Sequence, residues 1–251
     1  MIELPDISSY QDDNDTLRSV DFVKMATQTK AVIIKAGQGN WMDSDFKRFW
    51  VDSKAAGLAR GSYWYFDARY EPKIQARKYV DSLAGDLGEL PMVLDLEAAY
   101  STGNWQGWKN WVTMLDELKR LVPGKEIVIY TGYYYFKDNG PSYTFNKASL
   151  DWFKQFPLWI ASYNPTPTLP YPWTTYLFWQ YTDNGNGIQY GVESLNIDLN
   201  KFNGSWEDFA KRFGLAITPE PPTPTPTTPV AVEMALTFSD NSVKKYKLTE
   251  M

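Results

Sequence analysis

Two acidic residues separated by one leucine, Asp95 and Glu97, end an apolar run that begins at Pro91. Side chains alternate between the two faces of a β-strand, so both carboxyl groups would lie on one face. Two residues advance a strand by roughly 7 Å, which lets flexible carboxyl groups share a site and separate their pKa values. One could then donate a proton while the other stays ionised. An isolated pair of this kind is equally typical of a salt-bridged strand end.

Two further acids are predicted to lie at the same level. Asp6 ends the first predicted strand and Asp198 ends the last. The first and last strands of a closed barrel are neighbours, and active sites of α/β barrels lie at the carboxyl ends of the strands. Taken singly, Asp6 could cap a turn or helix and Asp198 could be a loop acid. Together, the four acids predict a cleft lined with carboxylates.

The composition excludes several other kinds of chemistry. The 251 residues include no histidine and no cysteine. Ser-His and Cys-His nucleophiles, histidine-ligated zinc, disulfides and cysteine metal sites are therefore excluded, and carboxylates are the obvious acid–base groups. No metal-ligand cluster or phosphate-binding glycine loop stands out, so we expect neither a metal nor a cofactor.

Charge and hydropathy restrict the partners. The net charge of -5 and the lack of a basic stripe argue against nucleic-acid binding. No apolar run approaches the roughly 20 residues of a membrane span, so no membrane insertion is expected. Residues 1–13 are acidic and lack the basic and apolar parts of a secretory signal, so we expect no signal peptide.

The elements that must position these acids follow from the hydrophobic pattern, which predicts βα units around a parallel sheet. The expected strands are residues 2–7, 31–36, 59–66, 91–97, 126–131, 157–162, 176–181 and 195–199. Helical periodicity is clearest in residues 45–56, 72–83 and 105–121. The Pro-rich segment 166–176 and the Gly/Asn-rich segment 183–191 predict loops in place of helices. We expect an α/β fold, an irregular TIM-like (β/α) barrel short of helices in its second half.

Three regions are expected along the chain. Residues 1–216 would form the catalytic barrel domain, and residues 217–229 a Pro/Thr-rich linker. Residues 230–251 would form a short β tail, with strands at 232–238 and 242–248. Because a lone hairpin is marginal in water, we expect this tail to dock, to bind the cell wall or to form a homo-oligomer.

Six more side chains are expected near strand ends. Lys35 shares the parity of Ile33 and would lie beside the carboxylates, where a structural ion pair explains it equally well. The others are Tyr63, Tyr65, Tyr130, Trp159 and Gln180, which could stack on or hydrogen-bond to sugars. Core packing is an equally good interpretation for each ring. The high aromatic content, 16%, favours some exposed rings in a groove that binds a flat or cyclic ligand such as a saccharide.

The order of the motifs resembles that of glycoside hydrolase family 25. The motifs are Asp6–Gln11, Ala31–Ala36, Arg60–Tyr63, Val93–Glu97, Ile129–Thr131, Leu158–Tyr163, Trp179–Tyr181 and Ile197–Asn200. The resemblance covers about residues 2–213, and the ordered set is more specific than any one piece. This chain departs from the family at Gln38, in a stretch where glutamate is frequent, and at Trp64, where histidine is frequent.

The resemblance implies a flattened, incomplete barrel and a muramidase of the phage endolysin type. Such an enzyme cleaves the β-1,4 bond between N-acetylmuramic acid and N-acetylglucosamine in bacterial peptidoglycan. By the same resemblance Glu97 is the general acid and Asp95 assists the substrate acetamido group or the oxocarbenium ion. Asp6 and Asp198 shape the electrostatics, and retention of configuration is expected. Without an export signal, the enzyme would stay in the host cytoplasm until its release to the wall.

Two alternatives stay open from the sequence. A chitinase-like barrel also carries acids on its fourth strand, but it would have an earlier aspartate where this chain has Val93. A non-catalytic wall-binding or virion structural protein could use the same barrel. The presence of all four acids favours an enzyme.

Overall fold

The computed structural model describes residues 2–12, 19–98, 107–216, 232–237 and 243–248. Spatial clustering divides the chain into two units, Met1–Leu215 and Ala216–Met251, and each is described here by itself.

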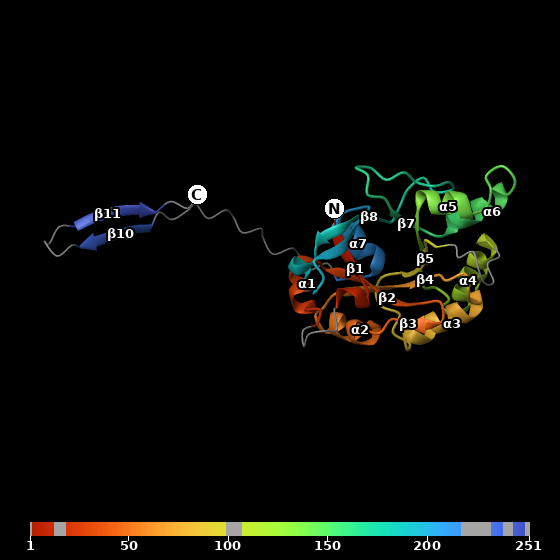
Figure 1. The fold of residues 1–251 in the computed structure, drawn as a ribbon, viewed down its shortest axis with the longest axis horizontal. Helices are drawn as coiled ribbons and strands as arrows, with labels where there is room; N and C mark the ends of the chain where they lie inside the picture. Colours follow the sequence, from red (N-terminus) through yellow and green to blue (C-terminus); the bar gives the residue numbers. More distant parts are fainter. Residues whose placement is uncertain (1, 13–18, 99–106, 217–231, 238–242, 249–251) are drawn as a thin grey trace. The chain divides into compact units, whose positions relative to one another are not determined.

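The first unit is a closed barrel of mixed strands (Figure 1). Around the barrel the order is β1, β9, β8, β7, β6, β5, β4 and β2, and β1 pairs with β2 to close it. The bounds are β1 Glu3–Ile7, β2 Ala31–Gln38, β4 Ala59–Tyr65, β5 Met92–Leu96, β6 Ile127–Gly132, β7 Leu158–Ala161, β8 Phe178–Asn186 and β9 Asn196–Phe202. A two-residue strand, β3 Trp41–Met42, pairs with the end of β2. All eight predicted strands and the irregular α/β barrel are confirmed.

The expectation of a parallel barrel is wrong at one strand. β9 runs antiparallel to both of its neighbours, β8 and β1. Only a short 3-10 helix, η3 Gly187–Tyr190, and a few flanking residues connect β8 to β9. A parallel return needs a crossover of a dozen or more residues, so the chain turns back directly. β8 also extends to Asn186, into part of the segment that was expected to be a loop.

Seven helices surround the barrel in the described residues (Figure 1). They are α1 Phe22–Gln28, α2 Phe46–Ala55, α3 Pro72–Ser82, α4 Trp108–Leu121, α5 Tyr133–Asn139, α6 Lys147–Trp152 and α7 Trp206–Phe213. The predicted helices correspond to α2, α3 and α4, whereas α1, α5, α6 and α7 were not predicted. Two further 3-10 helices are η1 Ser9–Gln11 and η2 Phe153–Gln155. The Pro-rich segment 166–176 forms no helix, as predicted.

The buried apolar residues form two layers that confirm the predicted facing of β5. Val93 packs inside the barrel, in one cluster with Ile33 of β2 and Val128 of β6. Leu94 and Leu96 belong to the other cluster, which lies between the strands and the helices. Asp95 has the parity of Val93, so its carboxyl group is turned into the barrel rather than under a helix.

The second unit contains a two-stranded antiparallel sheet. β10 Val232–Thr237 pairs with β11 Val243–Leu248, with Val232 opposite Leu248 and Thr237 opposite Val243. Both strands fall within the predicted ranges, whereas the expected linker at residues 217–229 lies outside the described residues. None of the helices described is both long and apolar enough to span a membrane.

Candidate active site

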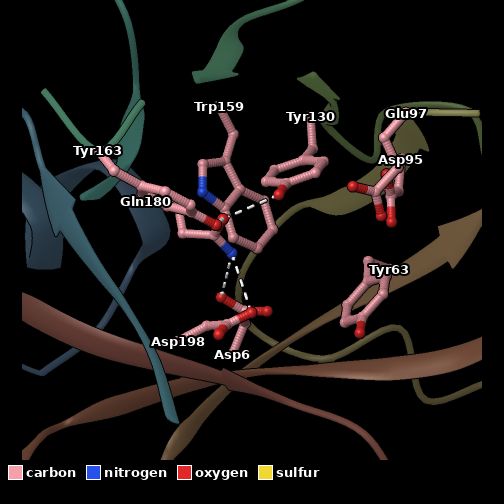
Figure 2. Close-up of a pocket in the computed structure, with 9 residues that line it drawn as sticks. All are labelled: Asp6, Tyr63, Asp95, Glu97, Tyr130, Trp159, Tyr163, Gln180 and Asp198. Carbon is pink, nitrogen blue, oxygen red and sulfur yellow. Dashed lines mark hydrogen bonds between the residues drawn. The ribbon is translucent and has the colours of Figure 1, made fainter. Parts of the chain in front are cut away.

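Four carboxyl groups meet at one end of the barrel (Figure 2). Asp6 on β1 and Asp198 on β9 are direct cross-strand partners, as closure of the barrel predicted. Asp95 lies near the end of β5, and Glu97 follows that strand directly. Figure 2 shows Asp95 and Glu97 together on one side of the pocket, with Asp6 and Asp198 on another.

These acids line a pocket of about 150 Å³, which we call the carboxylate pocket. Its lining is Asp6, Tyr63, Asp95, Glu97, Tyr130, Trp159, Tyr163, Gln180 and Asp198. A second cavity of about 370 Å³ shares the four acids and Tyr63 with it. We call this cavity the Lys35 pocket, because Lys35 lines it together with Tyr10, Gln38 and Tyr65. The acids therefore lie where two pockets meet, so a molecule that occupies both would cross them.

The amide of Gln180 fixes two of the carboxyl groups. Its Nε2 donates to Asp6 Oδ2 at 3.0 Å and to Asp198 Oδ2 at 3.3 Å. Its Oε1 accepts from the hydroxyls of Tyr130 at 2.9 Å and Tyr163 at 3.0 Å. Gln180 is buried. With both ends engaged, the amide has one orientation that satisfies all four partners.

A second buried amide, that of Asn200, also forms a hydrogen bond with Asp6. Asn200 donates from Nδ2 to Asp6 Oδ2 at 2.8 Å and to the carbonyl oxygen of Leu4 at 3.1 Å. Its Oδ1 accepts from Trp159 Nε1 at 2.7 Å. Asn200 and Trp159 are both buried, so this chain of hydrogen bonds sits in the barrel core. These hydrogen bonds hold the Asp6 side chain to the surrounding strands, so no ligand is needed to position it.

Lys35 provides a cation beside the acids. Its Nζ donates to Gln38 Oε1 at 3.3 Å and lies 5.4 Å from the centre of the Tyr65 ring. Its positive charge lowers the pKa values of Asp95 and Glu97, but burial and the neighbouring acids raise these pKa values by more. Lys35 forms no direct ion pair in the described part of the chain.

Burial and mutual repulsion raise the pKa values of the central pair. Burial, followed by the charge of Glu97, raises the pKa of Asp95 well above its usual range. The pKa of Glu97 is raised by desolvation and then by the charge of Asp6. Hydrogen bonding between the two side chains raises the pKa of Asp95 and lowers that of Glu97, so the titrations of the two acids are linked. One oxygen of Asp95, Oδ1, is buried without a hydrogen-bond partner in the described residues, which adds to the cost of its ionisation.

The other two acids are shifted in the same direction. Burial raises the pKa of Asp6, although Asn200 and Gln180 oppose this by hydrogen bonding. Burial and then the charge of Asp6 raise the pKa of Asp198 to about 8. Burial and the nearby acids also raise the pKa of Tyr63, so its hydroxyl stays protonated as a donor. The pocket thus holds protons at a pH where isolated carboxyl groups have lost them.

The raised pKa of Asp198 predicts a pH-dependent change in stability. An acid whose pKa is about 8 in the folded chain, against an ordinary 3.8, destabilises the fold progressively as the pH rises between those values. The variant Asp198→Asn keeps the neutral form, so we expect it to raise the melting temperature more at pH 9 than at pH 5. The control Asp138→Asn, on the exposed surface, should change neither value. Equal gains at both pH values would contradict the raised pKa.

The structure brings all ten predicted site residues to the two pockets. Eight line the carboxylate pocket, and Lys35 and Tyr65 line the adjoining one. Six further lining residues and one supporting residue were missed: Ile7, Ser8, Tyr10, Gln11, Gln38 and Tyr163 line the pockets, and Asn200 supports Asp6. Tyr10, Tyr163 and Asn200 lie in the quoted motifs, so a position next to a strand end was the available signal. No group that could hold a metal ion occurs in residues 2–12, 19–98, 107–216, 232–237 or 243–248.

Comparisons with known proteins agree with this geometry. The sequence pattern of Glycosyl hydrolases family 25 matches residues 5–189. The autolytic lysozyme of Clostridium acetobutylicum is 30% identical over 190 residues, which are 74% of this chain and 52% of that protein. YegX of Escherichia coli K12 is 28% identical over 209 residues, 81% of this chain and 70% of that protein.

Solved structures show the same fold. A bacterial lysozyme from Streptomyces coelicolor superimposes with a TM-score of 0.66 at 24% identity, covering 86% of this chain and 98% of that one. A family 25 glycosyl hydrolase from Bacillus anthracis superimposes with a TM-score of 0.67 at 24% identity, covering 84% of this chain and 93% of that one. Because the family pattern spans most of the barrel, including three of the four acids, this chain belongs to glycosyl hydrolases family 25.

Proposed function

We propose that this family 25 glycoside hydrolase is an N-acetylmuramidase, a lysozyme that cleaves the β-1,4 bond between N-acetylmuramic acid and N-acetylglucosamine in bacterial peptidoglycan. The observation that carries the proposal is the set of four carboxyl groups at the junction of two pockets. A linear saccharide in both pockets would present a glycosidic bond to these groups. Relatives named as lysozymes, among them Lysozyme M1 of Streptomyces globisporus at 28% identity, support the substrate.

Glu97 is the general acid in this proposal. It lies at the exposed rim of the pocket, where a leaving-group oxygen can reach it, and desolvation and the charge of Asp6 raise its pKa, which favours the protonated form that a general acid needs. Transfer of that proton to the glycosidic oxygen accompanies cleavage of the bond. The bond electrons leave with the oxygen, and positive charge develops on the sugar ring.

Asp95 acts on the sugar that gains this charge. Asp95 and Glu97 lie together on one side of the pocket (Figure 2), so Asp95 can support either the substrate acetamido group or the oxocarbenium ion while Glu97 acts on the leaving oxygen. Retention of configuration is the outcome that the family resemblance implies. Asp6 and Asp198 shape the electrostatics on the other side of the same pocket, where the raised pKa of Asp198, about 8, favours its neutral form at neutral pH.

A non-catalytic wall-binding or virion structural protein is the competing function, and one assay separates the two. The purified chain is incubated with purified bacterial walls, and both turbidity and newly formed reducing ends are measured. An enzyme lowers turbidity while reducing ends increase. A binding protein would sediment with the walls and produce no reducing ends, which would contradict the proposal.

We further propose that the enzyme serves as a phage endolysin, held in the host cytoplasm until its release. A likeness of fold to the CTP1L endolysin, with a TM-score of 0.64 over 84% of this chain, supports this role. Expression in a bacterium should cause lysis only when a pore-forming membrane protein is expressed with it. Lysis without that protein would contradict the role.

The tail is proposed as a separate element for docking, wall binding or self-association, joined to the barrel domain by the Pro/Thr-rich segment. A two-stranded sheet leaves unpaired edges and is marginal in isolation, so it needs a partner. Truncation after Thr218 should leave the hydrolysis of soluble muropeptides unchanged, while wall retention falls or oligomer size in light scattering decreases. If neither changes, the tail has none of these roles.

A further inference from the structure

A third pocket lies beyond the carboxyl ends of β6 and β7, among residues that have no role in the mechanism above. Its volume is about 420 Å³. We call it the tyrosine pocket, and it is lined by Gly132, Tyr133, Tyr134, Tyr135, Ala161, Ser162, Asn164 and Thr168. None of the acids of the carboxylate pocket takes part in this lining.

The tyrosine pocket and the carboxylate pocket are lined by residues that are close together in the sequence. After β7, Tyr163 lines the carboxylate pocket, whereas its neighbours Ser162 and Asn164 line the tyrosine pocket. On β6, Tyr130 lines the first pocket and Gly132, two residues further along, lines the second. The walls of the two pockets are therefore built from neighbouring residues at the ends of the paired strands β6 and β7, so the pockets lie beside each other at this end of the barrel.

The lining has the chemistry of a carbohydrate site. The rings of Tyr133 and Tyr134 pack edge to face, with centres 5.1 Å apart, and Tyr134 is 73% exposed. Aromatic rings of this kind offer flat apolar surface together with a polar end. In the described part of the chain, the side chains of Ser162, Asn164 and Thr168 make no hydrogen bond, so their polar groups are available to a ligand.

We propose that the tyrosine pocket binds a further sugar of the glycan strand, beyond the sugars on either side of the cleaved bond. This inference rests on the proposed muramidase function. A stem peptide, the other part of peptidoglycan, carries ionised groups, and the residues that line the pocket have no formal charge to pair with them. Of the two sugars, N-acetylglucosamine is uncharged and matches the hydroxyl and amide groups present, so it is the sugar that fits the pocket.

Two variants test the pocket, one by filling part of it and the other by removing part of its lining. Gly132 has a φ of -88° and no atom within 4 Å of the Cβ that a side chain would add, so Gly132→Leu adds bulk there without backbone strain. Tyr134→Ala removes an exposed ring. Phe145→Ala is the matched control, because this ring is 85% exposed and lines none of the three pockets.

The substrates are two series of glycan strands of increasing length, one that keeps its stem peptides and one freed of them by amidase treatment of peptidoglycan, and the length dependence is read from the peptide-free series. For the parent, kcat/KM should increase once a strand is long enough to reach the tyrosine pocket. Both variants should lose that increase, about five- to tenfold, and should match the parent on the shortest strand that is cleaved. The control should follow the parent at every length. Binding of long strands to each variant, measured by calorimetry with folding checked by circular dichroism, should weaken by the same factor.

Each other outcome overturns the inference. Variants that follow the parent at every length would show that the pocket binds no sugar. A loss that appears only on peptide-bearing strands would assign the pocket to the stem peptide. Equal losses at all lengths would indicate a general structural effect. A parent that cleaves no strand at all would remove the proposed muramidase function itself, and is distinguished by that lack of products.

Discussion

Replacement of Glu97 by glutamine is expected to lower the rate of wall hydrolysis by about a thousandfold, within the range for loss of a general acid. The amide keeps the size and shape of the side chain but has no proton to give to the leaving oxygen. Glu97 lies at the exposed rim of the pocket, so its replacement should leave the fold intact. Release of reducing ends measures the rate, and circular dichroism measures the fold.

The matched control is Glu207→Gln, the same chemical change on the first turn of α7, away from both pockets. It should retain the parent rate. If the Glu97→Gln variant hydrolyses walls at the parent rate, another group donates the proton, and the assignment of Glu97 is wrong.

Replacement of Gln180 by glutamate is the second change with a large expected effect, a loss of about a hundredfold in rate at neutral pH. Gln180 is a positioning residue, because it acts through Asp6 and Asp198. A carboxylate at this buried position would face both acids and repel them where the amide now donates two hydrogen bonds. Protonation at lower pH restores one donor, so part of the lost activity should return as the pH falls.

This dependence on pH separates positioning from simple damage to the fold. The control Gln155→Glu makes the same change at an exposed position on η2 and should keep the parent profile. A Gln180→Glu variant with a uniform loss at every pH would contradict the positioning role. A variant that matches the parent would show that the orientation of the amide has no effect.

The sequence predicted which face of a strand the acids occupy and at which end of the barrel they lie, because both follow from simple rules of strand geometry and barrel closure. The two-residue period of a strand placed Asp95 inside the barrel and Leu96 outside it, as observed. Barrel closure placed Asp6 opposite Asp198, although most of the chain separates the two residues in sequence. The level of Asp198 was predicted for a wrong reason: it was expected at the carboxyl end of a parallel strand, but it lies near the start of β9, which reaches this end of the barrel because the strand is antiparallel.

The features that were missed depend on contacts between distant residues. The role of Gln180 follows from hydroxyls and carboxyl groups that four other strands or strand ends supply. The side chain alone indicates only a polar group near a strand end. Likewise α1, α5 and α6 span only 7, 7 and 6 residues, too few turns to show a helical period in the sequence.

The central claim is that this barrel cleaves the muramic acid side of the glycan linkage, and the products test it directly. Purified peptidoglycan is digested with the enzyme, reduced with borohydride and analysed by mass spectrometry. A muramidase leaves N-acetylmuramic acid at the new reducing ends, so muramitol is the expected reduced terminus. Glucosaminitol at those ends would identify a glucosaminidase, and free stem peptides without new reducing ends would identify an amidase; either result would contradict the account.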